Sequence, residues 1–173
     1  MEHFPLYMTH DLTEIPSYPL PSGYQFRFFG AEDDDNKWAR IVTATGEFSK
    51  ETKALKRFNQ EFLPYLEAVR KRIVFLETTS GKTVGTAAAW FGECNNGTIG
   101  RLHWIEILPE FQGKGLGRPL ITEAMKLLAL YHTQAYLKTQ TTSRAAIHLY
   151  KKLGFKPVIS KDADRKFWKQ FET

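Results

Sequence analysis

The sequence contains a single cysteine, no hydrophobic run of membrane-spanning length and no N-terminal signal pattern. With Cys94 alone the chain cannot form an internal disulfide, and such a composition favours a reducing compartment. No stretch approaches the roughly 20 consecutive apolar residues of a transmembrane helix, and no basic segment followed by an apolar one opens the chain. These absences predict a soluble cytoplasmic protein without a membrane partner.

A strong excess of one charge is also missing. The chain has 24 lysines and arginines against 19 acidic residues, a formal net charge of +5 and a pI of about 9.3. The two signs are interspersed, and the basic residues show neither an RNP-like nor a helix-turn-helix arrangement. We therefore expect no nucleic-acid partner, and a basic pocket for a polyanionic ligand would explain part of the excess.

The chain shows no internal repeat and no low-complexity segment. Its 173 residues, 42% of them hydrophobic, suit one domain with a substantial core. Residues 1–23 carry Pro5, Pro16, Pro19 and Pro21, so we expect an extended arm lying on the domain rather than a helix. The domain itself is expected over residues 24–173.

Hydrophobic patterning predicts alternating strands and helices. Strands are expected at residues 24–29, 73–78, 83–91, 98–107, 135–139 and 155–159. Helices are expected at residues 33–44, 49–72 with a break at Pro64, 120–131, and 144–153 with Ser143 as cap and Gly154 as terminator. Asn96-Gly97 is a hairpin signal, so the strands between 73 and 107 should form an antiparallel meander. Residues 161–173 are either a last strand or a docked tail.

Three glycines at alternate positions, Gly113, Gly115 and Gly117, connect the strand that Pro109 ends to a long apolar-periodic helix. A strand, a glycine turn and a helix N-terminus suit a phosphate ligand, because the first helical N–H groups lack partners. The alternative is an ordinary tight turn. The glycine spacing fits neither the Rossmann G-x-G-x-x-G pattern nor a P-loop.

Two segments of the chain resemble one family. Residues 112–117, Gln-Gly-Lys-Gly-Leu-Gly, resemble the Q/R-x-x-G-x-G/A acyl-CoA loop of the GCN5-related N-acetyltransferase (GNAT) superfamily. Residues 146–155 resemble the A-x-x-L-Y-x-K-L-G-F segment of that family. Both occur in the family's order and at its usual separation, so the resemblance covers roughly residues 73–160. It implies an α/β (α+β) sandwich with a mixed, mostly antiparallel sheet of six to seven strands and helices on both faces.

The resemblance implies acetyl-CoA as co-substrate and no metal. In that fold the strands expected at 98–107 and 135–139 are parallel neighbours that splay apart, and acyl-CoA enters between them. The pantetheine would pair with the strand edge at Ile107 and Leu108. The remaining cofactor-binding residues are expected to be Gln112, Gly113, Lys114, Gly115, Leu116, Gly117 and Arg118 of the loop, and Ser143, which stands where the family usually has asparagine.

Acyl transfer to an amine calls for a base and, at the departing thiolate, an acid. Tyr150 matches the tyrosine that acts as acid in many family members, but it also lies on an apolar helix stripe. For the base, strand alternation places His103 and Glu106 on opposite faces, and a bulge before the loop could re-aim Glu106. His103 and Glu106 both remain candidates for the general base. The alternative for each is an ordinary polar residue without a catalytic role. Trp104 and Trp90 either wall the acceptor pocket or pack in the core.

We therefore expect an N-acetyltransferase that moves an acetyl group from acetyl-CoA to a primary amine by direct transfer in a ternary complex. No covalent enzyme intermediate is required, and Cys94 is interpreted as a small buried or half-buried hydrophobe. The alternative is a non-catalytic acyl-CoA-binding sensor or scaffold of the same fold. The expected partners are acetyl-CoA and an amine acceptor, with the chain as a monomer or homodimer.

Overall fold

The computed structural model describes residues 3–95 and 97–172. Its strands are β1 (Pro5–His10), β2 (Tyr24–Phe28), β3 (Ile73–Thr78), β4 (Thr83–Cys94), β5 (Gly97–Ile107), β6 (Ala135–Gln140) and β7 (Lys156–Pro157). Its α-helices are α1 (Asp34–Ala44), α2 (Glu51–Glu61), α3 (Leu66–Arg72), α4 (Gly117–Tyr131), α5 (Arg144–Lys152) and α6 (Asp162–Trp168). Short 3-10 helices are η1 (Leu63–Tyr65), η2 (Pro109–Phe111) and η3 (Lys169–Phe171). In this described part, no helix is long and apolar enough to cross a membrane.

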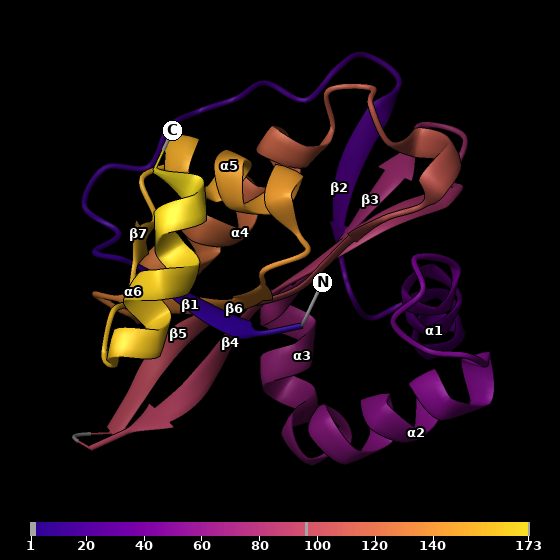
Figure 1. The fold of residues 1–173 in the computed structure, drawn as a ribbon. Helices are drawn as coiled ribbons and strands as arrows, with labels where there is room; N and C mark the ends of the chain where they lie inside the picture. The colour runs from indigo at the N-terminus through magenta and orange to yellow at the C-terminus, as the bar shows by residue number, and fades with distance from the viewer. Residues whose placement is uncertain (1–2, 96, 173) are drawn as a thin grey trace.

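All seven strands belong to one sheet, in the order β2-β3-β4-β5-β6-β1-β7 (Figure 1). β3, β4 and β5 form the predicted antiparallel meander. Asn96 of the predicted hairpin turn lies outside the described residues. β5 and β6 pair in parallel, while the other neighbouring strands are antiparallel. The prediction of a mixed, mostly antiparallel sheet is confirmed.

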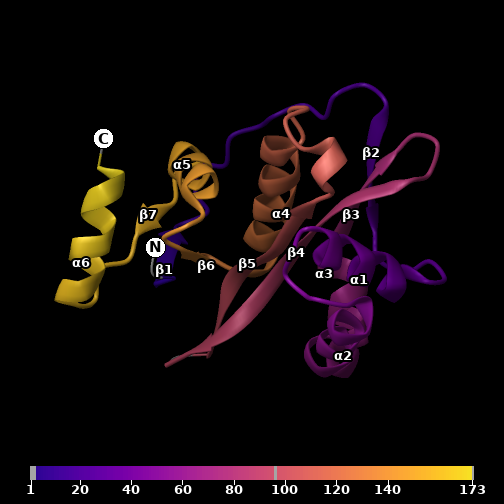
Figure 2. The same ribbon diagram turned by 45° about the vertical axis from the view of Figure 1, so that its right-hand side comes forward.

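Helices cover both faces of this sheet (Figures 1 and 2). α1, α2 and α3 gather on one side, and α4 and α5 lie on the other. Residues 83–90 of β4 are buried throughout, as expected for a strand covered on both faces. The predicted break at Pro64 is confirmed, since η1 separates α2 from α3 there.

The N-terminal segment differs from the expected arm. Residues 5–10 form β1, which lies inside the sheet between β6 and β7. Leu6, Met8 and His10 are buried at alternate positions, and this period-2 pattern outweighed the proline content of the segment. Pro5 is the first residue of the strand, where its missing N–H is tolerated.

The C-terminal segment corrects one further expectation and decides between two alternatives. The last strand is only two residues long, Lys156–Pro157, and Pro157 cannot donate to the ladder. Residues 162–168 form a helix, so the docked tail and not the last strand is present. The carboxylate of Asp164, in the first turn of this helix, accepts the N–H groups of Ser160 and Lys161. This tail docks through Trp168 and Phe171, both almost completely buried.

β5 and β6 stay together only at their starts. They pair at Gly100–Ala135 and Arg101–Tyr136 and separate beyond these positions. A Cβ atom at Gly100 would lie 3.0 Å from the carbonyl oxygen of Gln134, so a side chain at this position would crowd the close approach of the two strands. The expected splay between the two strands is therefore present, and it opens the space in which the candidate site lies.

Candidate functional site

A β-bulge in β5 sets the direction of the side chains in the opening. Ala88 of β4 pairs with His103 and Thr86 with Glu106, so β5 has one extra residue between these pairs. Trp104, within the bulge, has a φ of 49°, which is unusual for a non-glycine residue. Because of the extra residue, His103 and Glu106 lie on the same face of the sheet. Simple alternation had placed them on opposite faces, and the re-aiming bulge considered for Glu106 is present.

Aromatic packing stabilises the bulge. The ring of Trp104 lies 5.4 Å from that of Trp38 in an edge-on arrangement and 5.6 Å from that of Phe48. Trp38 and Phe48 belong to α1 and the loop after it, so these contacts fix the helical layer against the bulge. Trp90 is buried and packs on Phe62 at 4.8 Å, which supports the core interpretation for this residue.

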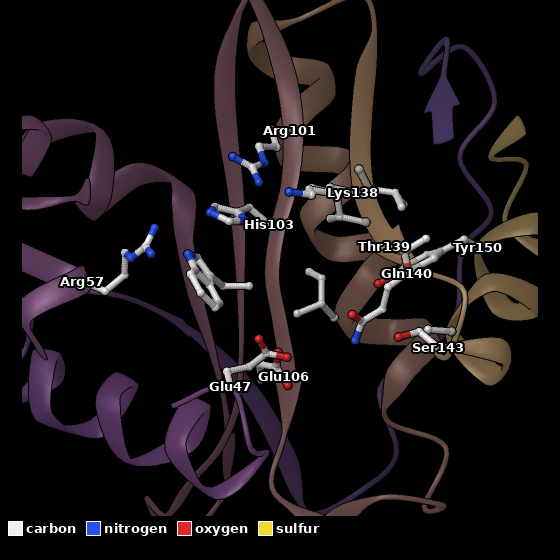
Figure 3. A pocket seen from close by; sticks show the side chains of 15 residues that line it. Glu47, Arg57, Arg101, His103, Glu106, Lys138, Thr139, Gln140, Ser143 and Tyr150 are labelled. Carbon is white, nitrogen blue, oxygen red and sulfur yellow. The ribbon is translucent and has the colours of Figure 1, made fainter. Parts of the chain in front are cut away.

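The first of two adjoining cavities occupies the opening between β5 and β6 (Figure 3). This polar cleft has a volume of about 510 Å³. Basic and acidic side chains both reach into it. Its lining residues are Glu47, Arg57, Arg101, Leu102, His103, Trp104, Ile105, Glu106, Leu137, Lys138, Thr139, Gln140, Ser143, Ala146 and Tyr150.

The second cavity lies against the glycine turn and measures about 620 Å³. We call it the loop cavity. Its walls are more apolar, and α4, α5 and the N-terminal segment contribute to them. It is lined by Tyr18, Pro19, Ile105, Glu106, Ile107, Phe111, Gln112, Gly113, Gly115, Leu116, Gly117, Arg118, Pro119, Ile121, Ala145, Ala146, Leu149 and Tyr150. Ile105, Glu106, Ala146 and Tyr150 line both cavities, so the two spaces meet at these residues.

The glycine turn has a backbone that only glycine adopts easily. Gly113 has a φ of 73° and Gly115 a φ of 75°, and a Cβ atom at either position would meet nothing within 4 Å. Between described residues, no hydrogen bond is donated by a backbone N–H of residues 113–118. These N–H groups, at the start of α4, are therefore available to an anion.

The structure brings most, but not all, of the predicted cofactor residues to the loop cavity. Leu108 is buried, and its N–H donates to the carbonyl of Val84 at 2.8 Å, so it is committed to the sheet. Lys114 does not line the cavity, and its Nζ lies 4.9 Å from the ring centre of Phe111. Gln112 donates from Nε2 to the carbonyl of Ile107 at 2.9 Å and thereby ties the turn to the end of β5.

Ser143 lies at the polar cleft instead of the loop cavity. It occupies the N-cap position of α5, as predicted, but its side chain makes no capping hydrogen bond. Its backbone carbonyl accepts the N–H of Ile147 at 3.0 Å, which is the first hydrogen bond of the helix.

Glu106 is an unusual carboxylate, because it is mostly buried where the cavities meet. Burial, together with the neighbouring carboxylate of Glu47, raises the pKa of Glu106 to about 7, against a hydrogen bond with Thr45. Figure 3 shows Glu47 and Glu106 at the same end of the polar cleft. A carboxylate with a pKa near neutrality can both take and release a proton under physiological conditions.

His103 lies further along the same face and is hydrogen-bonded to Glu61 of α2. Burial opposes ionisation of Glu61, yet the bonds from His103 and Trp104 hold the pKa of Glu61 below its ordinary value. Burial lowers the pKa of His103 and outweighs the hydrogen bond and negative charge of Glu61, which act to raise it, while the positive charges of Arg101 and Arg57 lower it further. The pair is therefore best described as a neutral imidazole donating to a charged carboxylate.

Tyr150 of α5 faces Glu106 from the other side of the junction. Burial raises the pKa of its phenol above the ordinary value, and the negative charge of Glu106 adds to this effect. The ring packs edge-on against Phe155 at 5.8 Å, and the residue also lines the loop cavity. Tyr150 therefore both packs on the apolar side of α5 and lies at the candidate site. Tyr150 is thus a protonated phenol at the meeting point of the two cavities.

Several residues at the site were missed from the sequence. Tyr18 and Pro19 come from the N-terminal segment, and Arg118 of α4 lies over the Tyr18 ring at 5.5 Å. Glu61 and Glu47 come from the helical layer. No local pattern marks these residues, because their positions depend on how distant segments pack.

Other chemical groups lie away from the junction. Cys94 lines neither cavity, and it is exposed at the end of β4, which corrects the expectation of a buried or half-buried position. Within residues 3–95 and 97–172, no three His, Cys, Asp or Glu side chains are grouped so as to hold a metal ion.

Comparisons with known proteins give a consistent result. Residues 10–155 match the model of the acetyltransferase (GNAT) family. A mycothiol acetyltransferase from Thermobispora bispora is 31% identical over 157 residues, which is 83% of this chain and 50% of that protein. Another, from Pseudarthrobacter chlorophenolicus, is 26% identical over 161 residues, which is 86% of this chain and 47% of that protein.

A solved structure agrees in fold. The GCN5-related N-acetyltransferase from Sphaerobacter thermophilus superposes with a TM-score of 0.71 at 19% identity, over 90% of this chain and 49% of that one. The chain therefore spans about half the length of these relatives.

Proposed function

Since the chain belongs to the acetyltransferase (GNAT) family, we propose that it moves an acetyl group from acetyl-CoA to a primary amine by direct transfer in a ternary complex. We propose further that residues 24–173 act as one acetyltransferase domain, to which the N-terminal segment contributes β1 and part of the loop cavity wall. The observation that carries the proposal is the meeting of two cavities at Glu106 and Tyr150.

The loop cavity has the properties that acetyl-CoA requires. The N–H groups of residues 113–118, which have no partner among the described residues, suit a pyrophosphate, and the open space beside Gly113 and Gly115 lets phosphate oxygens approach the backbone. Ile107, at the free edge of β5, is the candidate for pairing with the pantetheine. Arg118 adds positive charge at the same wall. When bound, acetyl-CoA supplies the activated acetyl thioester.

Glu106 is the proposed general base. An alkyl ammonium has an ordinary pKa of about 10.4, so an acceptor must lose a proton before it can attack. Glu106 lines both cavities, whereas His103 does not line the loop cavity and already donates to Glu61. The pKa of Glu106, about 7, leaves a large fraction of this carboxyl group ionised near neutral pH. The ionised carboxylate can accept the proton of the acceptor amine, directly or through water.

Tyr150 is the proposed general acid. Its phenol stays protonated at physiological pH because burial and Glu106 both disfavour the phenolate. A proton on its hydroxyl oxygen can therefore pass to the departing thiolate. Cys94 is remote from both cavities, which supports transfer without a covalent enzyme intermediate.

Two measurements test the proposal. Acetyl-CoA at about 100 times its dissociation constant should stabilise the protein by about 2.7 kcal/mol, visible as a rise in Tm of several degrees, whereas NAD and ATP should not match it. Release of free CoA thiol with a panel of primary amines then tests turnover. Binding without thiol release for any amine would favour a non-catalytic acyl-CoA sensor and contradict the proposed reaction.

A further inference from the structure

We infer that the acceptor amine also carries an anionic oxygen group, a carboxylate or a phosphate, which binds at the basic end of the polar cleft. This inference rests on the proposed function and names the class of its second substrate. The basic end consists of Arg57 from α2, Arg101 from β5 and Lys138 from β6.

These three cations converge from separate elements. All line the polar cleft, and in Figure 3 the ends of the Arg101 and Lys138 side chains lie beside each other. Arg101 and Arg57 also lie close enough to His103 to disfavour its protonation. The three residues are far apart in the sequence, so only folding brings their positive charges together.

The cations lack matching acids. Among described residues, Arg57, Arg101 and Lys138 take part in no ion pair within 4.0 Å. The Nε atom of Arg101 is buried and has no hydrogen-bond partner in the described part of the chain. Glu61 offsets some of the charge on Arg101, but its hydrogen-bonding oxygen already accepts from His103 and Trp104.

A buried donor without a partner is costly, and such a donor at a cavity wall is usually satisfied by a ligand or water. A planar guanidinium with a free N–H suits carboxylate or phosphate oxygens, which accept several hydrogen bonds at once. The unpaired cations therefore favour an anionic ligand group over a neutral one.

The opposite end of the cleft is acidic. Glu47 and Glu106 lie there, beside the junction with the loop cavity. This polarity would orient an acceptor with its ammonium toward Glu106 and its anionic group toward Arg101. The bulge shortens the five-residue span between the two residues to about four strand steps, so their Cα atoms are separated by roughly 13 Å at ~3.3 Å per residue. Such a separation suits an acceptor whose amine and anionic group are several bonds apart.

Matched pairs of small amines test the inference. Glycylglycine is compared with glycylglycinamide for the carboxylate, and O-phosphoethanolamine with ethanolamine for the phosphate. For each compound, kcat/KM is measured by CoA thiol release, and Kd by calorimetry in the presence of CoA. The anionic member of at least one pair should be preferred roughly 10- to 100-fold, the range typical of charge-assisted hydrogen bonds. The pair that shows the preference identifies the group.

Variants then assign the preference to the basic end. Arg101→Gln should remove most of it by weakening only the anionic compound, and Lys138→Gln, at an exposed position, should reduce it without endangering the fold. Arg70→Gln, on the exposed side of α3 and outside the cleft, is the matched control and should leave it unchanged. Thermal unfolding confirms that each variant is folded.

The outcomes separate the two proposals. Neutral and anionic amines bound and used equally well would overturn this inference and leave the acetyltransferase proposal intact. A preference that Arg101→Gln and Lys138→Gln leave untouched would also overturn it. Tighter binding of anionic amines through Arg101, without thiol release from any compound, would support this inference and contradict the proposed reaction.

Discussion

His103 donates a hydrogen bond from Nε2 to the carboxylate of Glu61 and thereby links β5 to α2. Because an ionised carboxylate can only accept, the proton must lie on Nε2, and the Nδ1 atom of the neutral ring keeps its lone pair. Trp104 donates to the same oxygen of Glu61 at 3.3 Å. The pair therefore anchors the bulge, and His103 is a positioning residue beside Glu106 in our proposal.

The pH dependence of kcat/KM should identify the base. In the wild-type protein kcat/KM should rise with pH through about 7, as Glu106 loses its proton and becomes able to accept one from the acceptor. Glu106→Gln should remove this inflection and lower kcat/KM by about 100-fold, a typical contribution of general base catalysis. The measurement is initial-rate CoA thiol release between pH 5.5 and 9, corrected for ionisation of the amine.

His103→Gln is the matched variant, because glutamine can still donate to Glu61. It should keep the inflection and most of the rate. If His103→Gln abolished the inflection while Glu106→Gln kept it, the base would be His103, and our choice between the two candidates would be wrong.

Tyr150→Phe isolates the proposed acid. The substitution removes only the hydroxyl, and the apolar ring contact with Phe155 remains. We expect kcat to fall by about 100-fold with acetyl-CoA affinity nearly unchanged, because the proton is needed only as the thiolate leaves. The wild-type protein and Tyr150→Phe are compared by their single-turnover rates and by their calorimetric Kd values for acetyl-CoA. A full rate at every pH would leave Tyr150 with a packing role only.

The sequence predicted those parts of the site that local patterns encode. The turn has positive φ angles at Gly113 and Gly115, and glycine is the residue that adopts such angles most easily. The glycines in the sequence therefore indicate the turn directly. The meander followed from alternation and the turn signal. The bulge at Trp104 could only be considered as a possibility, because contacts with Trp38 and Phe48 of a distant segment stabilise it.

The parts that could not be predicted depend on long-range packing. β1 has a period-2 pattern, but it is only six residues long and begins with a proline, and its place in the sheet depends on pairing with the distant strands β6 and β7. Leu108 was assigned to the cofactor from its position near the loop, yet its N–H belongs to Val84. Alternate residues of a strand direct their N–H and C=O groups to opposite neighbours. The sequence of one strand does not show which residues direct these groups to the open edge of the sheet.

Gly115→Ala separates backbone conformation from available space. A Cβ atom would meet nothing within 4 Å, so the cost comes from the φ of 75°, about 1 kcal/mol of stability for a non-glycine residue. The same substitution at Gly81, in the β3–β4 turn with a φ of 91° and equally open surroundings, is the control. Both variants should lose similar stability, but only Gly115→Ala should weaken acetyl-CoA binding. Equal Kd values in calorimetry would argue against the turn as the pyrophosphate site.

The raised pKa of Glu106 also has a consequence for stability. Its folded-state pKa of about 7 lies above the ordinary value of 4.5, so the folded protein keeps this proton over a range in which the unfolded chain has released it. The carboxylate therefore destabilises the fold progressively as pH rises from about 4.5 to about 7, and the effect is complete above that range. Glu106→Gln removes the penalty, because the amide is neutral at every pH and similar in shape.

We expect Glu106→Gln to be about 1–3 kcal/mol more stable than the wild-type protein at pH 8 and nearly equal to it at pH 4.5. Thermal or urea unfolding at the two pH values measures the difference, and Glu32→Gln, at an exposed position, should show no such pH-dependent gain. A gain of the same size at both pH values would mean that packing, and not ionisation, causes it. A stability loss at pH 8 would mean that the charged carboxylate is stabilised by its surroundings, which would remove the physical basis for Glu106 as the base.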